Sequence, residues 1–523
     1  MIKVTNFIYS VSFRILKFIG IIFSFLLFMS ALLFSSSDTD ITTFKTFVTT
    51  DNILPGIAGI LGFLGLMLLL YICCKKYPIR TVRILLAVTL SGYAIIGTLF
   101  IVFAQSAPNT DSLFIYEIAQ HCAKNDFTDI NRDSYLSIYP HQIGLVFFYE
   151  PLLRIWNLLG INAEAYVFLQ FVNLLLVLTL IYFLYKLTDK LFQNAFATVY
   201  SMVLAIGYLP LYLYILRVYG DLPSLTFFVV GLWALAEIIS PKPSKIHENR
   251  LYRCFLYILN ITCFILSVAT RKNSIIGLIA VMIITLLVIL HQKRWSLLLL
   301  FCGYLLVSLF TLPVIQTFYE TRAESTLDEG TPPIAYIAMG MQNAPKACGW
   351  YNGFNYNVYV ESGHNIDFIN KYSHTQIKDR LSYFKENPSD AFDFYFEKYA
   401  SQWCDGTYAS RELTAYTPEK RPAFLKNFYS KDGGVIFLFL CNCFQNLLYL
   451  GVLLFCLSSC IEKNGKNLLP YTLILIAFGG FLFHFLWEAN ARAIFSYTVL
   501  LLPVSGAGMA ALTLHLSQFV AKK

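Results

Sequence analysis

Apolar residues fill most of the chain in runs of about twenty residues, and short polar connections separate these runs. A helix built from such a run is long enough to span a bilayer. The pattern predicts twelve membrane-spanning helices, at residues 15–34, 53–74, 82–104, 163–185, 194–216, 222–239, 252–270, 274–290, 296–316, 434–458, 468–487 and 491–515. The apolar stretch 143–160 is interrupted by Glu150-Pro151 and Arg154, so it is expected to lie on the membrane as an interfacial helix.

The composition agrees with a chain that is mostly embedded in lipid. Of the 523 residues, 57% are hydrophobic and 13% are charged, whereas about 25% of a typical soluble domain is charged. The first apolar run is longer than the core of a signal peptide, and no A-x-A cleavage site follows it, so it is expected to remain as the first helix. These features predict an all-α polytopic membrane protein.

Basic residues are concentrated in every second connection between the predicted helices. They include Lys75 and Lys76, Lys242 and Lys245, and Lys463 and Lys466. Because short loops rich in Lys and Arg stay in the cytoplasm, the pattern predicts a multi-pass protein of the cell membrane with both termini cytoplasmic. The segments 105–142 and 319–433 are then expected to lie outside the cytoplasm.

The predicted helices and loops divide the chain into five parts. These are three helices in 1–104, a first outer loop with interfacial helices and a candidate catalytic acid in 105–162, six helices in 163–318, an extracytoplasmic domain of mixed structure in 319–433, and three helices in 434–523. Transporters are commonly built from matched halves. The long loop between the ninth and tenth helices has no counterpart, which counts against a transporter.

Two carboxylates follow the third predicted helix directly. Asp111 stands in "NTDS", and Glu117 follows one to two turns later. Since "NTDS" is also a good helix-capping sequence, a capping role or a solvated loop position is the alternative for Asp111. The same loop contains "YLSIYPHQIG", in which Tyr139, His141 and Gln142 suit a pocket that is half in water and half in lipid.

Charged residues also occur at three other outer helix ends. The connection "RVYGDLPS" carries Arg217, Tyr219 and Asp221, and its simpler interpretation is a turn closed by an Arg217–Asp221 salt bridge. Arg271 and Lys272 stand in "RKNS" between two helices of minimal length. An unpaired charge near the bilayer is costly, so these cations are expected to have a carboxylate or a phosphate as partner.

The last of these outer connections, "LWEANAR", carries Glu488 and Arg492 four positions apart. In a continuous helix they would share a face, and a mutual salt bridge is one interpretation. In the other, Arg492 faces a lipid phosphate and Glu488 orients it. Arg suits phosphate because its planar fork donates two parallel hydrogen bonds.

A lipid-anchored phosphate substrate would fit this arrangement of charges. Cations at the helix ends would hold the phosphate and stabilise it as a leaving group, and a carboxylate would take the proton of an incoming hydroxyl. This chemistry is glycosyl transfer from a polyprenyl-phosphate sugar with Asp111 as general base. The chain has no Walker loop and no dinucleotide-binding motif, and no nucleic-acid partner is expected.

Most of the twelve cysteines lie in apolar runs and are expected to behave as small core residues. No cysteine or histidine spacing indicates a metal site. Cys348 and Cys404 share the long segment 319–433 and could form a disulfide if that segment is extracytoplasmic.

The chain resembles the GT-C class of integral-membrane glycosyltransferases, near the protein O-mannosyltransferases and the aminoarabinose transferases. The resemblance rests on the acid in "TDSLFIYEIA" early in the first large outer loop, on the interfacial segments and on the late outer domain. The pieces "YLSIYPHQIG", "RVYGDLPS", "RKNS" and "LWEANAR" are similar to uncharacterised relatives from Gram-positive bacteria. Two features depart from the class: the acid follows the third helix rather than the first, and "TDS" has one acid where many members have two, so Glu117 or Asp126 are further candidates.

The resemblance implies an inverting transfer to an acceptor outside the cytoplasm, such as a cell-wall polysaccharide, a teichoic acid or a protein. Arg271, Lys272 and Arg492 are the expected phosphate ligands. Some members of the class use a divalent metal and others do not, and no cofactor is assigned here. The alternatives are a polysaccharide polymerase or ligase that uses polyprenyl-diphosphate glycans, and a flippase or transporter for lipid-linked glycans.

Overall fold

The computed structural model describes residues 2–37, 46–50, 53–240, 249–417, 421–461 and 467–521. Lys242, Lys245, Lys463 and Lys466 of the basic loops lie outside the described residues. Eleven of the described helices are long and apolar enough to span a membrane, which confirms an all-α polytopic membrane protein. They are α1 (Ile2–Leu33), α2 (Ile53–Cys74), α3 (Pro78–Ala104), α7 (Ala165–Phe192), α10 (Asp221–Ile239), α11 (Arg250–Thr270), α12 (Ser274–Gln292), α13 (Leu298–Ala323), α20 (Lys431–Ile461), α21 (Leu469–Leu486) and α22 (Ala491–Ala521).

The predicted helix 194–216 is divided into α8 (Ala195–Gly207) and α9 (Leu209–Tyr214). Pro210 lies in the first turn of α9. Because proline has no backbone N–H to donate to a preceding turn, it begins a helix more readily than it continues one. With 13 residues, α8 is about 20 Å long and shorter than the hydrocarbon core of a bilayer.

The segment 105–162, expected to be the first outer loop, contains α4 (Thr110–Ala123), α5 (Tyr135–Ile138), the 3-10 turn η1 (Pro140–Gln142) and α6 (Ile143–Leu159). α6 continues through Pro151, and its buried Glu150 binds Arg154 and also Arg322 at the end of α13. This contact fixes α6 against the bundle. Gly144 lies so close to the carbonyl of Ala269 that a side chain there would collide with it.

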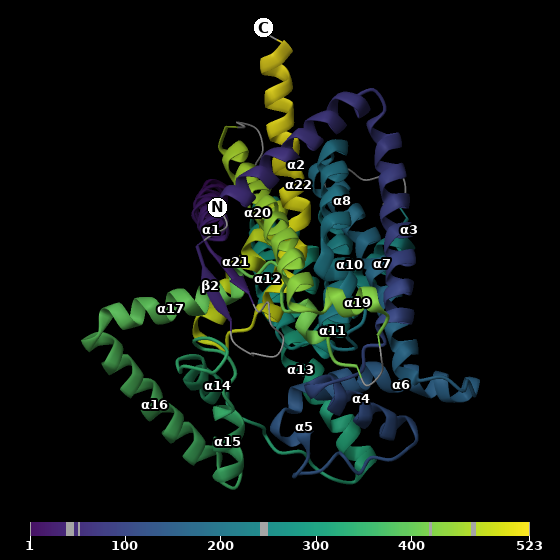
Figure 1. The fold of residues 1–523 in the computed structure, drawn as a ribbon, viewed down its shortest axis with the longest axis vertical. Coiled ribbons are helices and arrows are strands. Elements are labelled where there is room, and N and C mark those ends of the chain that lie inside the picture. The colour runs from purple at the N-terminus through teal and green to yellow at the C-terminus, as the bar shows by residue number, and fades with distance from the viewer. Residues whose placement is uncertain are drawn as a thin grey trace.

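The regular structure of the long segment 319–433 is helical. It contains α14 (Pro333–Gly340), α15 (Phe354–Glu361), α16 (Ile366–Glu386), α17 (Pro388–Trp403), α18 (Ser410–Leu413) and α19 (Ala423–Phe428). A short hairpin of β1 (Ser35–Ser37) and β2 (Phe47–Thr49) packs beside α17 and pairs Ser36 with Val48. Figure 1 shows α4–α6 and α14–α17 at the same end of the bundle, opposite the C-terminus.

Cys348 and Cys404 do not form a disulfide in this structure. The Cys348 thiol donates a hydrogen bond to Glu397 of α17, 3.2 Å away, and Cys404 is buried at the end of the same helix. The two cysteines are therefore held by different neighbours.

Candidate active site

Three arginines from distant parts of the chain lie close together at one end of the bundle. Arg217 precedes α10, Arg271 follows α11, and Arg492 lies in the first turn of α22. The ring of Tyr219 has a guanidinium group near it from two of them, with Arg217 at 5.3 Å and Arg492 at 5.0 Å from its centroid. Burial and the nearby charge of Arg492 lower the pKa of Arg271 to about 10 and also lower the pKa of Arg217. So much positive charge at one place favours binding of an anion.

Arg217 is only 3% exposed and is incompletely hydrogen-bonded. Its Nη1 atom donates to the side-chain oxygen of Asn109 at 3.0 Å, and to the carbonyl of Leu413 at 3.4 Å. Its Nε and Nη2 atoms are buried and have no partner among the described residues. A buried donor without an acceptor is costly, so these two nitrogens are suited to an oxyanion.

Asp221 pairs with Arg271 and not with Arg217. The interpretation of "RVYGDLPS" as a turn closed by an Arg217–Asp221 salt bridge is therefore wrong. Asp221 is the first residue of α10, and Gly220 before it lies against the carbonyl of Thr270, where any side chain would collide. This close approach brings the end of α11, and with it Arg271, next to the Asp221 carboxylate, while Arg217 extends toward Asn109.

Asp111 lies in the first turn of α4, beside the arginine cluster. The N-cap residue of α4 is Asn109, whose backbone N–H donates to the Ser112 hydroxyl at 3.1 Å. The cap position is thus taken by a neighbour of Asp111. The Tyr135 hydroxyl donates to the Asp111 carboxylate, and Asp111 is close enough to Tyr219, Arg492 and Glu488 to interact with each electrostatically.

Glu488 is the second carboxylate of this site. It lies on the linker 487–490 between α21 and α22, so no continuous helix runs through Glu488 and Arg492, and the condition under which they would share a helix face is not met. No ion pair joins these two residues in the described part of the chain. Burial raises the pKa of Glu488 to about 7, the charge of Arg492 lowers it, and Asp111 raises it. The linker is held by a hydrogen bond from the amide of Ala489 to the carbonyl of Gly349, at 2.8 Å.

The residues of "YLSIYPHQIG", in the segment between α4 and α6, line the same site. The Gln142 amide donates to the Tyr219 hydroxyl at 2.5 Å. Burial and the charge of Lys272 lower the pKa of His141 to about 4, against an opposite effect of Asp111, so the imidazole is neutral at pH 7. Tyr139 hydrogen-bonds to Tyr351 of the long segment 319–433.

The other candidate residues from the sequence lie at the edge of this site or outside it. Lys272 is exposed and lies near His141. Glu117 is exposed and lies about 120° around α4 from Asp111. Asp126 is exposed and accepts hydrogen bonds from the amide and hydroxyl of Thr128. Neither Glu117 nor Asp126 belongs to the cluster around Arg217.

Several residues of the site were not singled out in the sequence. Asn109 and Tyr135 belong to the same loop as Asp111, and their position close to that acid in the sequence could have identified them. Lys398 on α17 carried no such signal. It is 1% exposed, donates to the carbonyl of Gly340, and lies near Glu488. Burial lowers the pKa of Lys398 to about 7, although the Glu488 charge raises it.

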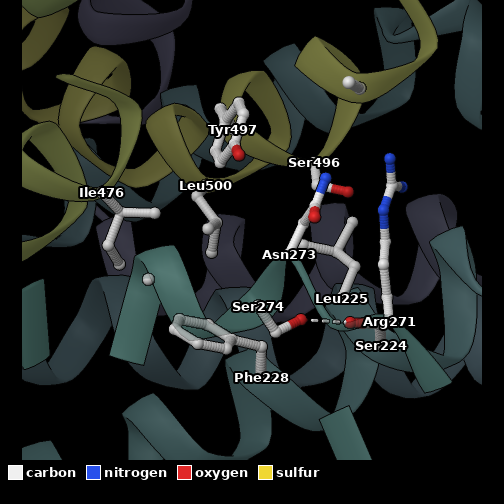
Figure 2. Close-up of a pocket in the computed structure, with 12 residues that line it drawn as sticks. Ser224, Leu225, Phe228, Arg271, Asn273, Ser274, Ile476, Ser496, Tyr497 and Leu500 are labelled. Atoms are coloured by element: carbon white, nitrogen blue, oxygen red, sulfur yellow. Dashed lines mark hydrogen bonds between the residues drawn. The ribbon is translucent and has the colours of Figure 1, made fainter. Parts of the chain in front are cut away.

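A pocket of about 40 Å³ lies beside Arg271, between α10, α12, α21 and α22. Figure 2 shows Asn273, Ser496 and Arg271 on one side of it, and Ile476, Phe228 and Leu500 on the other. The hydroxyls of Ser224 and Ser274 are hydrogen-bonded at 2.5 Å across its edge. The pocket therefore passes from polar to apolar lining.

The described residues contain no group of three or more His, Cys, Asp or Glu side chains placed to hold a metal ion. The arrangement that they do provide is a carboxylate, Asp111, close to Arg492 of the three-arginine cluster and to a second carboxylate of raised pKa, Glu488. Such a site can bind an anionic group and accept a proton next to it.

A solved structure of the archaeal oligosaccharyltransferase AglB from Archaeoglobus fulgidus, in complex with an inhibitory peptide and a dolichol-phosphate, is similar to this chain at a TM-score of 0.43 and 13% identity. The similarity covers 86% of this chain and 52% of that one, so this chain spans about half the length of the archaeal enzyme. No curated protein matches the sequence. A family model described as "Conserved hypothetical integral membrane protein" matches residues 2–505. The chain belongs to this family of conserved integral membrane proteins.

Proposed function

We propose that this protein is a membrane glycosyltransferase of the GT-C type, which moves a sugar from a polyprenyl-phosphate donor to an acceptor outside the cytoplasm. The observation that carries the proposal is the placement of Asp111 close to Arg492, which in turn lies close to Arg217 and Arg271, with buried guanidinium nitrogens of Arg217 and Arg492 that have no partner among the described residues. In this proposal both termini are cytoplasmic and the segment 319–433 is extracytoplasmic, as the distribution of basic residues favours.

The donor phosphate would lie against the arginine cluster. The free donors there are Nε and Nη2 of Arg217 and Nε of Arg492. Hydrogen bonds from guanidinium to phosphate are charge-assisted and stronger than neutral ones. They would also stabilise the extra negative charge that the phosphate acquires as the bond to the sugar breaks.

The transfer step needs one proton acceptor. The acceptor hydroxyl attacks the anomeric carbon of the sugar, the bond from that carbon to the phosphate oxygen breaks, and polyprenyl phosphate leaves with the bonding electrons. Asp111 takes the hydroxyl proton as the new glycosidic bond forms, and the anomeric configuration inverts because attack is from the opposite side. The apolar side of the pocket in Figure 2 would accommodate the first part of the lipid chain.

A diphosphate-linked glycan is a second candidate donor. It is favoured by the number of cations, because Arg217, Arg492 and the nearby Lys272 remain outside the Arg271–Asp221 pair and exceed what one phosphate diester needs. A polymerase or ligase would use such a donor. A comparison of binding affinities for the monophosphate and the diphosphate distinguishes the two candidate donors.

The experiment uses the purified protein in lipid nanodiscs with polyprenyl phosphate and polyprenyl diphosphate as probes. Arg217→Ala and Arg492→Ala are expected to weaken binding of the monophosphate, and Asp111→Asn, which removes a negative charge from the site, is expected not to weaken it. Stronger binding of the diphosphate would favour the second candidate, and unchanged binding in both arginine variants would refute the phosphate site.

The matching activity measurement uses a strain that lacks the protein. Mass spectrometry of its wall glycans should show the loss of one sugar substituent. The parent gene is expected to restore this substituent, and the Asp111→Asn gene is not. Full restoration by the Asn variant would reject Asp111 as the base.

A further inference from the structure

α17 has two chemically different sides. Five of its six aromatic residues recur at spacings of three and four, which places them on one side of the helix. They are Phe392, Tyr395, Phe396, Tyr399 and Trp403. The acids Asp390, Asp393 and Glu397 lie on the other side, together with Phe394, which is buried against Phe384 of α16. α17 is therefore amphipathic, although it belongs to the segment expected to form an extracytoplasmic domain.

The aromatic side of α17 continues the outer surface of the membrane-spanning helices. Phe396 packs edge-on against Phe34, directly after α1, with 4.8 Å between ring centroids. Tyr395 stacks on Phe485 near the end of α21 at 4.5 Å. Phe485 and its neighbours Leu482 and Leu486 are themselves exposed on α21. In Figure 1, α17 extends to the side of the bundle.

Phe392 extends this surface beyond the bundle. Its side chain is 70% exposed, and its ring stacks on that of Phe396 with 6.1 Å between centroids. Two adjacent aromatic rings facing water are unfavourable, but they are common where a helix lies at the boundary between acyl chains and headgroups. The continuity with the lipid-facing side of α21 identifies the bilayer as what covers them.

We propose that α17 lies in the membrane interface, with Phe392 and Phe396 among the lipids, and that its opposite side fixes the linker 487–490 of the candidate active site. The partner is the bilayer itself. Because the polar side carries Asp390 and Asp393, apolar burial and not attraction to anionic headgroups drives the insertion.

The contacts to the linker come from the far end of α17. Gln402 accepts a hydrogen bond from the amide of Asn490 at 3.3 Å, and Ser401 accepts one from the indole of Trp350 at 2.8 Å. Lys398 donates to the carbonyl of Gly340. Gly349, which accepts from Ala489, has the Lys398 side chain against it. Glu488 is thus held between residues that are all attached to α17.

This arrangement gives the bilayer a part in shaping the site. When the aromatic side of α17 is inserted, the helix is fixed relative to α21, and so is the linker that carries Glu488 and leads to Arg492. Removing the insertion would free the linker without altering any residue near Asp111. The inference does not depend on which donor the site binds.

Tryptophan scanning in nanodiscs tests the position of α17. Phe392→Trp places a new indole on the aromatic side, and Asp393→Trp places a matched indole on the exposed polar side. The fluorescence of the new indole is the emission of each variant minus that of the parent protein. Two quenchers are applied separately: phosphatidylcholine brominated in the upper acyl chain, as the nanodisc lipid, and iodide in the buffer. Bromolipid quenching is expected to be about twofold stronger for Phe392→Trp than for Asp393→Trp, with the reverse order for iodide. Equal quenching of the two variants by bromolipid would overturn the insertion.

Hydrogen exchange in nanodiscs tests the coupling to the linker. Phe392→Ser should accelerate exchange of the amides of residues 487–490 several-fold, and Asp393→Ser should leave them at the parent rate. Both substituted positions are exposed, so neither variant creates a cavity. Parent exchange rates in Phe392→Ser would overturn the coupling, even if the quenching places α17 in the interface.

Discussion

The guanidinium group of Arg271 is paired with the carboxylate of Asp221, fifty positions earlier in the chain. The pair joins the end of α11 to the beginning of α10, and Asp221 is 2% exposed. One nitrogen of Arg271 is engaged there, and the buried nitrogens without a partner among the described residues belong to Arg217 and Arg492. Of the three arginines, Arg271 is therefore the one that an ion pair fixes, and Arg217 and Arg492 are the two that keep buried unpartnered donors.

Asp221→Asn should destabilise the protein. It leaves Arg271 buried without a counter-charge, and loss of one partner of a buried pair costs about 3–5 kcal/mol. The free energy of unfolding, measured by titration of the detergent-solubilised protein with a denaturing detergent, is expected to fall by about that amount. Asp379→Asn, at an exposed position on α16, should change it by less than about 0.5 kcal/mol. A loss no larger than that of the control would contradict a buried pair.

Arg217→Met should separate stability from binding. Two of its buried nitrogens lack partners, so replacing the charge with an apolar chain should leave the unfolding free energy unchanged or raise it by up to about 4 kcal/mol. Polyprenyl-phosphate binding should weaken at least about tenfold, since a hydrogen bond to a charged group contributes about 1.5–3 kcal/mol. A variant that binds normally, or that loses stability and binding together, would indicate a structural arginine.

Glu488→Gln should remove a pH dependence of donor binding. The pKa of Glu488 is raised to about 7 by burial. Above that pH the carboxylate is charged and repels a phosphate at Arg492, and below it the neutral acid does not. A phosphodiester donor keeps its charge throughout, so parent affinity should rise as pH falls through about 7, by about tenfold if the coupling is one pKa unit.

The Gln variant should bind at all pH values as the parent does at low pH, measured by titration of nanodisc-embedded protein between pH 5.5 and 8.5 (a range of about 1.5 units on either side of the pKa). Glu117→Gln, at an exposed position on α4, is the matched control and should keep the parent profile. A pH-dependent Gln variant would assign the titration to another group.

Glu150→Gln should detach α6 from α13. The Glu150 carboxylate receives two hydrogen bonds from Arg322, at 2.7 and 2.9 Å, one from Arg154 at 2.8 Å, and one from the Tyr319 hydroxyl. Loss of the charge should lower the unfolding free energy by about 3 kcal/mol or more. Arg132→Ala breaks the exposed 3.8 Å contact with Asp328 and should cost less than about 1 kcal/mol. Equal losses of unfolding free energy in the two variants would contradict the larger contribution expected of the buried ion pair.

The position of most helices could be predicted from the sequence, because the bilayer requires long apolar runs and the chain supplies them. The predicted helix 53–74 coincides with α2. The prediction of one helix over 194–216 was wrong, because the helix is interrupted near Pro210, where apolar residues continue but the backbone hydrogen bonding of the helix does not. Hydropathy reports side-chain polarity alone, so it does not detect such a break inside an apolar run.

The candidate site could be predicted as a set of residues but not as a set of contacts. Charges at the ends of the predicted membrane helices identified Asp111, Arg217, Arg271 and Arg492, since an ionised group next to lipid is rare without a role. Lys398 was missed because α17 is polar enough for a lysine to pass as a surface residue, and only the folded chain buries it.

The sequence by itself determined that this is an all-α polytopic membrane protein with ionised side chains at several helix ends, because these properties follow from the local order of apolar and polar residues. The tertiary structure alone decided that Asp221 pairs with Arg271, that Arg217 keeps two nitrogens without a partner among the described residues, and that Gln402 of α17 binds the linker that carries Glu488. Those choices depend on how closely helices far apart in the chain approach each other. That distance is set by small residues such as Gly220 and by packing across the whole bundle.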